Sequence, residues 1–369
     1  MKKAVIVLPT YNEAGNIKEV LDKIVENTKS STKWKVEILV VDSKSKDGTS
    51  QIVKNLQKKY PQIHLMETEK EGLGKAYTRG FTYAIQHLHP YLIFEMDADL
   101  SHNPKMIPKF LKEIEEGADF VIGSRYIKGG SIPKDWGMHR KFFSFFGNLI
   151  VRFGFMKLSV SDWTSGYRAI KTWVIKSALN HIKHYSGYVF QIALLDQAIK
   201  NRAVVKEVPI NFVDRKAGVS KINLAQNTFQ NLLYIFTYSS FIKFVIVGFI
   251  GFIIDFGISY LLIEKAQAQV WLSTAASAET AIISNFLLNN FWSFSHKKIE
   301  VSLKSYTSSF IKFNLVSSGS LLIQITGLQI LVVLLGKKFW YLYKVLIIAF
   351  VIIPYSYILY NKVIWKDKG

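Results

Sequence analysis

Residues 91–102 read Tyr-Leu-Ile-Phe-Glu-Met-Asp-Ala-Asp-Leu-Ser-His, an apolar run that leads into two aspartates separated by one residue. We interpret 91–94 as a buried strand. Similar short apolar runs occur along the first 125 residues, with amphipathic stretches between them, at 5–8, 36–41, 63–66 and 120–122. This alternation predicts an α/β domain with a mixed, mostly parallel sheet.

Loops rich in Asp, Asn, Gly and Ser follow three of these runs, at 10–16, 42–49 and 97–103. Sheets of this kind bind ligands outside the carboxyl ends of their strands. Two carboxylates at a strand end, here Asp97 and Asp99, can hold a divalent cation such as Mg²⁺ or Mn²⁺ that also binds a diphosphate. The same Asp-x-Asp pattern is common in solvated turns, so its meaning depends on the rest of the chain.

The composition divides the chain into a water-soluble part and a membrane part. The 369 residues suggest two or three domains. A net charge of +20 would fit a nucleic-acid partner, but the basic residues cluster beside apolar helices, which argues against one. Apolar residues make up 49% and charged residues only 20%, so part of the chain does not face water. The absence of cysteine excludes disulfides, zinc–thiolate sites and a cysteine nucleophile.

Beyond residue 240 the sequence predicts an all-α membrane domain of four helices. A membrane helix needs about 20 residues, and four apolar segments reach that length, at 243–263, 270–292, 312–335 and 341–364. Lysines between the second and third segments and at the C-terminus place both regions in the cytoplasm with the N-terminal domain. We therefore expect a multi-pass protein of the cell membrane. Asp255 and Glu279 lie inside the first two segments. Acids within a membrane helix are either functional groups or polar contacts between helices.

Two further segments, 141–158 and 223–240, are rich in aromatic residues, and the first carries Lys141, Arg152 and Lys157 without an acid. This composition is typical of amphipathic helices that lie on a membrane surface, although ordinary core helices are the alternative. The predicted division is thus a catalytic domain at 1–222 that includes the interfacial helix 141–158, a linker helix at 223–240 and a membrane domain at 241–369.

Several motifs share one order with a known family. They occupy 8–13, 40–49, 72–81, 97–102, 123–130 and 165–167. This ordered set resembles the family 2 inverting glycosyltransferases, and within them the dolichol-phosphate mannose synthase and polyprenyl-phosphate glycosyltransferase branch, over residues 1 to about 222. The resemblance implies a GT-A fold, which is Rossmann-like. Residues 285–294 resemble the GtrA-like four-helix membrane domain, which occurs fused to such synthases.

The resemblance implies a metal-dependent enzyme that transfers one sugar with inversion to the phosphate of a polyprenyl or dolichyl phosphate. The favoured donor is GDP-mannose, with UDP-glucose next, and membrane lipids are further partners; association into a homo-oligomer is left open. A processive polysaccharide synthase would need a Gln-x-x-Arg-Trp motif, which the sequence lacks. A non-catalytic lipid-linked sugar flippase or scaffold remains an alternative.

Site residues follow from the residues and the resemblance together. Tyr11 can stack on a nucleobase, and Asp42 can accept hydrogen bonds from a base or ribose. Arginine forks match phosphate oxygens. The predicted catalytic residues are Asp97, Asp99, Arg125 and Arg215, and the predicted metal ligands are Asp97, Asp99 and Ser101. The acceptor phosphate is assigned to Arg125, Arg140 and Ser144. The nucleotide sugar is assigned to Pro9, Tyr11, Glu13, Val40, Asp42, Asp97, Ala98, Asp99, Ser101, Arg125, Arg215 and Lys221.

The chain departs from the family pattern at three positions. Relatives usually have a second aspartate where this chain has Ser43, and some have Gln where it has Ser101. They also tend to read Phe-Gln-Ile-Glu, whereas Ala193 replaces the acid here. If that acid orients a sugar hydroxyl or an arginine, its loss puts the sugar specificity in doubt.

Overall fold

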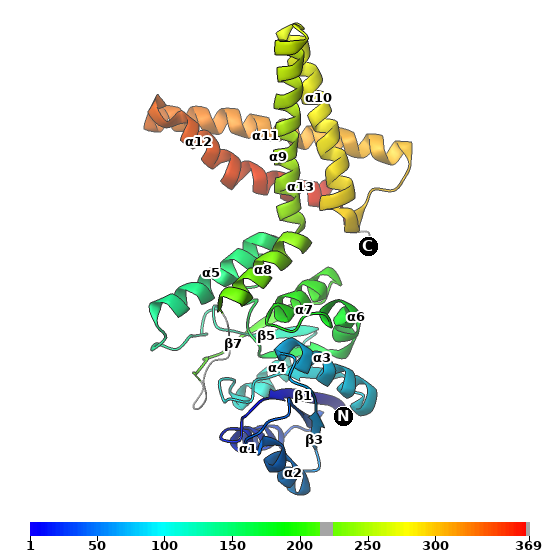
Figure 1. The fold of residues 1–369 in the computed structure, drawn as a ribbon, viewed down its shortest axis with the longest axis vertical. Coiled ribbons are helices and arrows are strands. Elements are labelled where there is room, and N and C mark those ends of the chain that lie inside the picture. The colour runs from blue at the N-terminus through cyan, green and yellow to red at the C-terminus, as the bar shows by residue number, and fades with distance from the viewer. Residues whose placement is uncertain (215–223, 367–369) are drawn as a thin grey trace. The chain divides into compact units, whose positions relative to one another are not determined.

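The structure is a computed structural model that describes residues 1–214 and 224–366. The chain folds as two compact units, Met1–Tyr234 and Ile235–Gly369 (Figure 1). Each unit is described by itself below.

The first unit is built on a seven-stranded sheet with the strand order β3-β2-β1-β4-β6-β5-β7. All neighbouring strands are parallel except where β6 meets β4 and β5. The prediction of a mixed, mostly parallel sheet is therefore confirmed. The strands are β1 Lys2–Thr10, β2 Trp34–Asp42, β3 Ile63–Glu67, β4 Leu92–Glu95, β5 Phe120–Ser124, β6 Arg168–Lys171 and β7 Val205–Pro209.

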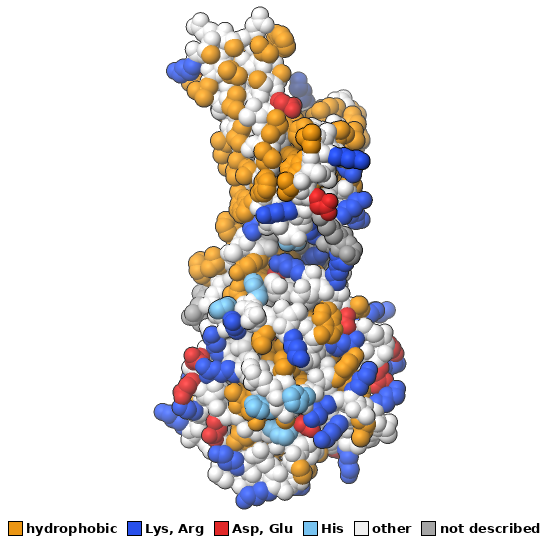
Figure 2. Space-filling model, turned by 90° about the vertical axis from the view of Figure 1, so that its right-hand side faces the viewer, with side chains coloured by type: hydrophobic (Ala, Val, Ile, Leu, Met, Phe, Trp, Pro, Cys, Tyr) orange, Lys and Arg blue, Asp and Glu red, His pale blue; other side chains and the backbone are white. Residues whose placement is uncertain are grey.

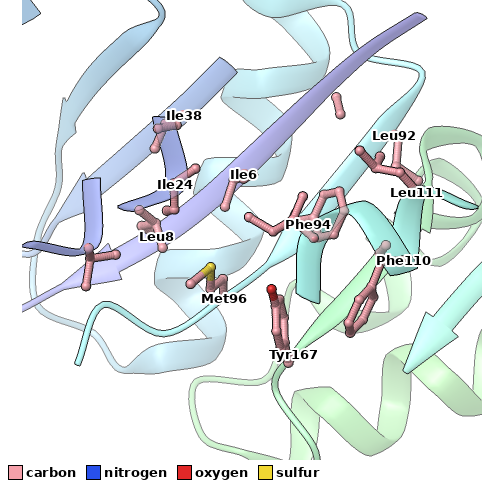
Figure 3. Packing of buried hydrophobic residues seen from close by; sticks show 14 of the residues in the cluster. Ile6, Leu8, Ile24, Ile38, Leu92, Phe94, Met96, Phe110, Leu111 and Tyr167 are labelled. Carbon is pink, nitrogen blue, oxygen red and sulfur yellow. The ribbon is translucent and has the colours of Figure 1, made fainter. Parts of the chain in front are cut away.

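Helices cover both faces of this sheet, which explains why its central strands are apolar on both sides. The helices of this unit are α1 Ile17–Thr28, α2 Thr49–Lys59, α3 Leu73–Tyr83, α4 Ile107–Glu115, α5 Met138–Phe155, α6 Thr172–Ile182, α7 Val189–Lys200 and most of α8 Leu224–Tyr238. On one face, Ile6, Leu8 and Phe94 pack in a core that includes residues of α1 and α4 (Figure 3). On the other face, α3 approaches so closely that Gly80 lies against Val7 and Val41.

The side-chain alternation of β4 prepares the site. Successive side chains of a strand point to opposite faces. Phe94 and Met96 enter the core beside Phe110 and Tyr167 (Figure 3). Glu95 therefore points to the opposite face of the sheet. The strand ends at Glu95, two residues before Asp97.

Helix α5 carries a row of exposed aromatic side chains, which include Phe142, Phe143, Phe145, Phe146 and Phe153. Helix α8 likewise exposes Phe229, Leu233 and Phe236. The opposite side of α8 is anchored, because Tyr234 is buried and donates a 2.8 Å hydrogen bond to Asp196 Oδ2 of α7.

The second unit is helical: α9 Ser240–Tyr260, α10 Val270–Leu288, α11 Leu303–Leu335, α12 Trp340–Ile347 and α13 Ile353–Val363. Short π-helical segments follow α9, α10 and α12, and the last of them, Ile348–Ile352, joins α12 to α13. Hydrophobic side chains cover much of its surface in Figure 2. Among the described residues, three helical stretches are long and apolar enough to cross a membrane: Ser240–Lys265, Leu303–Leu335 and Lys337–Val363. The second predicted crossing, 270–292, forms α10 but is not among these three. Its interior carries Ser, Thr, Glu and Asn, so the count of four crossings stays a prediction.

Buried Asn290 joins three segments at one end of this unit. Its Oδ1 accepts hydrogen bonds from the Ile299 N–H at 3.0 Å and from Trp365 Nε1 at 3.1 Å. Its Nδ2 donates to Tyr306 Oη at 3.1 Å. Asn290 belongs to the 285–294 motif, so that part of the motif has a structural role.

Candidate active site

The loop after β4 brings Asp97 and Asp99 to the carboxyl edge of the sheet. Asp99 is nearly buried, and its Oδ1 accepts a 3.0 Å hydrogen bond from the Ser101 N–H. The turn requires Leu100 to adopt a left-handed conformation with φ of 67°. Side chains other than glycine rarely occupy this region, and such strain is often found at functional sites.

His102 anchors the Asp97–Asp99 loop. Its ring is buried, stacks on Tyr167 at 4.9 Å, and accepts a 3.0 Å hydrogen bond at Nδ1 from the Asp97 N–H. Burial lowers the pKa of His102 to about 4, although Asp99 opposes that shift. The imidazole is therefore neutral at pH 7, with its proton on Nε2, which lies 3.8 Å from Asp97 Oδ2.

The loop has the donor set of a cation site that is completed by a ligand. No group of three His, Asp or Glu residues suited to a metal occurs in the described part of the chain. The Ser101 hydroxyl, however, is buried and has no hydrogen-bond partner among the described residues. Mg²⁺ is commonly held by one or two carboxylates together with phosphate oxygens. Asp97, Asp99 and Ser101 fit that arrangement.

Tyr11 lies at the end of β1, where the Lys70 ammonium sits 3.8 Å from the centre of its ring. The neighbouring Glu13 lies in the turn before α1: its N–H donates to Thr49 Oγ1 at 2.9 Å, and its Oε2 accepts from Asn16 Nδ2 at 2.9 Å. The Tyr11 ring therefore stands at the expected edge of the sheet, while Glu13 joins the loops that follow β1 and β2.

Asp42 has a different set of partners from the one we expected. The residue is fully buried, and its carboxylate accepts hydrogen bonds from Thr10 Oγ1, the Ser45 N–H, Ser45 Oγ and Ser50 Oγ at 2.6–2.9 Å. A carboxylate offers about four acceptor positions. In this conformation Asp42 organises the ends of β1 and β2, and its contact with a base or ribose stays a prediction.

Three other predicted nucleotide contacts differ in their access to a ligand. Val40 is a member of the hydrophobic core, and its backbone lies inside the sheet between Leu8 and Leu65. This placement does not favour a contact with nucleotide. Pro9 is half-buried near the end of β1, and Ala98 is buried within the aspartate loop.

Arg125 follows β5 and is held by an acid from a distant loop. Its Nε and Nη2 donate to the two carboxylate oxygens of Asp162 at 2.7 and 2.8 Å, and Nη2 also donates to Thr164 Oγ1 at 2.9 Å. Burial lowers the pKa of Arg125, but the charge of Asp162 outweighs it and the net pKa is raised. The guanidinium is therefore always charged and fixed in direction.

The other predicted acceptor residues lie on α5. Arg140 Nη1 donates to Asp214 Oδ2 at 3.0 Å, and its guanidinium lies 3.9 Å from the centre of the Trp136 ring. Ser144 Oγ shares a 2.6 Å hydrogen bond with Tyr126 Oη. Arg215 and Lys221 lie outside the described residues.

Phe212 lies between the aspartate loop and the candidate acceptor residues Arg125 and Arg140. The centre of its ring lies 5.9 Å from that of His102 and 5.8 Å from that of Trp136, both in edge-on packing. The Arg125 guanidinium lies 5.6 Å from the same ring centre. The aspartate loop, Arg125 and the Trp136–Arg140 pair are thus neighbours. Sequence reasoning missed Phe212, Trp136 and Asp162. The sequence signal for Phe212 was its place two positions before Asp214, and the signal for Asp162 was the Ser165–Tyr167 motif that follows it.

Comparison with known proteins identifies both parts of the chain. The model of glycosyl transferase family 2 matches residues 5–196. The chain belongs to this family. Residues 243–365 match the GtrA/DPMS transmembrane domain. Both resemblances inferred from the motifs are confirmed, and with its apolar helices this family 2 glycosyltransferase is a membrane protein.

Three curated relatives of this glycosyltransferase are similar over most of their own length. Dolichol-phosphate mannosyltransferase of Pyrococcus furiosus is 30% identical over 324 residues, which are 85% of this chain and 86% of that protein. Polyprenol monophosphomannose synthase of Mycolicibacterium smegmatis is 37% identical and covers 60% of this chain and 82% of its own. Undecaprenyl-phosphate mannosyltransferase of Micrococcus luteus is 33% identical and covers 60% and 88%.

The geometry of the aspartate loop leads to a first prediction. Asp99→Asn keeps the shape of the side chain and removes its charge, so we expect at least a hundredfold loss of sugar transfer, on the order of 3 kcal/mol of transition-state stabilisation. The melting temperature should stay close to that of the wild type. Transfer within tenfold of the wild-type rate would remove Asp99 from the mechanism.

Proposed function

We propose that this glycosyltransferase moves a single mannose from GDP-mannose to the phosphate of a polyprenyl or dolichyl phosphate, with inversion at the anomeric carbon. One observation carries the proposal: α5 bears both Arg140 and Ser144 and also the row of exposed aromatic side chains. A lipid with a phosphate head group matches such a helix. The names of the three relatives support mannose and a polyprenyl carrier.

The reaction needs little acid–base chemistry from the protein. A phosphate oxygen of the acceptor is already ionised at neutral pH and attacks the anomeric carbon directly. As the new oxygen–carbon bond forms, the bond from that carbon to the diphosphate breaks and GDP leaves with the electron pair. A divalent cation held by Asp97, Asp99 and Ser101 would supply positive charge for the departing diphosphate.

The arginines position the two reactants. Asp162 fixes the Arg125 guanidinium near the aspartate loop, so its charge is available at the point where the nucleophile and the diphosphate meet. Arg140 is half exposed and paired with Asp214, so an incoming phosphate can exchange with or share that carboxylate's position. We also propose that Arg215 and Lys221 contact the donor.

The donor is tested by ligand stabilisation of the full-length protein with Mg²⁺ or Mn²⁺ present. A ligand that binds only the folded state stabilises it in proportion to the logarithm of its concentration above Kd. We expect GDP and GDP-mannose to raise the melting temperature, whereas UDP and UDP-glucose should not. Stabilisation by UDP-glucose alone would replace mannose in the proposal, and absence of any effect would favour a non-catalytic role.

The acceptor is tested by Arg140→Lys, which preserves charge but loses the bidentate fork. We expect the apparent KM for polyprenyl phosphate to rise about tenfold, with a fall in kcat if the fork also aligns the attack. Stabilisation by GDP without acceptor should hardly change. An equal loss of GDP binding would place Arg140 on the nucleotide side instead.

We further propose that the membrane domain crosses the bilayer four times, with the catalytic domain and the C-terminus in the cytoplasm. The lysines near 297–304 and 362–368 support this orientation. A tag placed after Gly369 should react with an impermeant reagent only after the cells are opened. Labelling of intact cells would mean an odd number of crossings or the opposite orientation.

A further inference from the structure

A buried pair of opposite charges lies directly beneath the aspartate loop. Glu95 of β4 and Arg168 of β6 are register partners in the antiparallel pair, and both side chains are fully buried. Arg168 Nε lies 3.7 Å from Glu95 Oε2. Because side chains alternate along a strand, Glu95 points to the face opposite Phe94 and stands two residues before Asp97.

Arg168 connects three parts of the catalytic unit. Its Nη1 donates to the Gln191 carbonyl oxygen at 2.8 Å, near the start of α7. Its Nη2 donates to the Trp163 carbonyl oxygen at 2.8 Å, in the loop between α5 and β6. With Glu95 on the third side, one guanidinium joins β4, α7 and this loop.

The loop that Arg168 holds is the one that carries Asp162. Residues 161–165 also have other supports. The N–H groups of Ser161 and Asp162 donate to Glu207 at 2.9 and 3.0 Å, and Asn148 bonds the Trp163 N–H and Thr164 Oγ1 at 2.8 and 3.1 Å. The buried Trp163 ring stacks on Phe155. Asp162 in turn holds both Nε and Nη2 of Arg125. The carbonyl that Arg168 binds belongs to Trp163, the residue next to Asp162, so Arg168 contributes to the position of the acid that directs Arg125.

Stability alone explains this pair poorly. Removing two charges from water costs more than their attraction returns unless hydrogen bonds satisfy both groups. Among the described residues, no well-formed hydrogen bond reaches either carboxylate oxygen of Glu95, and Arg168 Nε and Gln191 Oε1 also lack one. Burial raises the pKa of Glu95 to about 7, although Arg168 and the nearby Gln191 side chain oppose that shift. An apolar pair would cost less at this position. The pair lies between Asp97 and the Asp162 loop. A role in positioning these two segments explains its location better than packing does.

We propose that Arg168, with Glu95 as its counterion, is a positioning residue that fixes the spacing between the aspartate loop and Arg125. The pair touches neither substrate. It acts by holding the end of β4 and the Asp162 loop to one guanidinium. The aspartate loop, which would bind the metal, and Arg125, which would bind the phosphate, then keep a fixed spacing. The inference rests on the proposed roles of Asp97 and Arg125. It adds Arg168 as a residue that neither binds substrate nor holds the metal.

The test compares two conservative variants with a matched control in the full-length protein. Arg168→Lys keeps the charge but cannot reach both carbonyl oxygens, and Glu95→Gln keeps the shape but removes the counterion. We expect both to lower kcat by about tenfold or more and to raise the acceptor KM, because a small misplacement of reacting groups costs that much. Stabilisation by the nucleotide that binds the wild type should persist.

The control is Lys171→Met, on the same strand. Lys171 pairs with Asp119 at 2.9 Å and lies opposite Leu92, at the end of β6 away from the aspartates. We expect it to lower the melting temperature while kcat and KM stay at wild-type values. Adding Asp162→Asn to Arg168→Lys should cost no more activity than Asp162→Asn alone, because both changes release the same arginine.

Unchanged kcat and KM in Arg168→Lys and Glu95→Gln would overturn the inference. So would losses of activity that merely follow the melting temperature, as in the control, or that add fully to those of Asp162→Asn. If Arg168→Lys does not fold, Glu95→Gln decides alone. A wild type that prefers another nucleotide sugar would refute the GDP-mannose proposal, and the same kinetic comparison would then use that donor.

Discussion

A buried guanidinium has to be balanced within the protein, because water cannot reach it and its charge cannot be lost at any ordinary pH. Arg168 is in this position, with Glu95 across the sheet and two carbonyl oxygens at its fork. These partners come from segments far apart in the sequence. Placing the arginine therefore fixes the end of β4, the start of α7 and the loop that holds Asp162 relative to one another.

The same principle of paired charge recurs in the candidate acceptor site. Arg125 is paired with Asp162 and Arg140 with Asp214. Arginines without acids would repel one another and attract any anion. With acids, each guanidinium has a defined direction, and a bound phosphate must compete with or complement a carboxylate. If the acceptor phosphate reaches both arginines at once, as we propose, it would compete with these carboxylates better than an ion that reaches only one arginine.

Much of this architecture could be predicted from the sequence, and the parts that could not share a physical cause. The alternation of apolar runs located five strands and the aspartate loop, because strand ends and polar loops are local features. Strands β6 and β7 were not predicted: they are short and pair only with distant segments. Phe212 and Asp162 act through contacts across the fold. The hydrogen bonds that fill Asp42 come from serines and a threonine, residue types that are common in any loop.

The departure at Ala193 also acquires a meaning that the sequence alone did not supply. The sequence predicted that, if the missing acid orients a sugar hydroxyl or an arginine, its loss puts the sugar specificity in doubt. In the structure, the buried Arg168, which binds the Gln191 carbonyl near the start of α7, has its acidic neighbour on β4, at Glu95. The sequence shows that Glu95 directly follows the apolar run 91–94. It does not indicate that the partner of Glu95 is Arg168 on β6.

The placement of Arg140 and Ser144 on an aromatic-rich helix has a consequence for how the two substrates meet. A lipid acceptor diffuses within a plane, whereas a nucleotide sugar diffuses through a volume. If α5 lies at the lipid surface, the encounter with acceptor depends on its mole fraction among the lipids and not on its bulk concentration. Diluting the membrane with inert lipid would then slow the enzyme even when the total amounts of protein, donor and acceptor are constant.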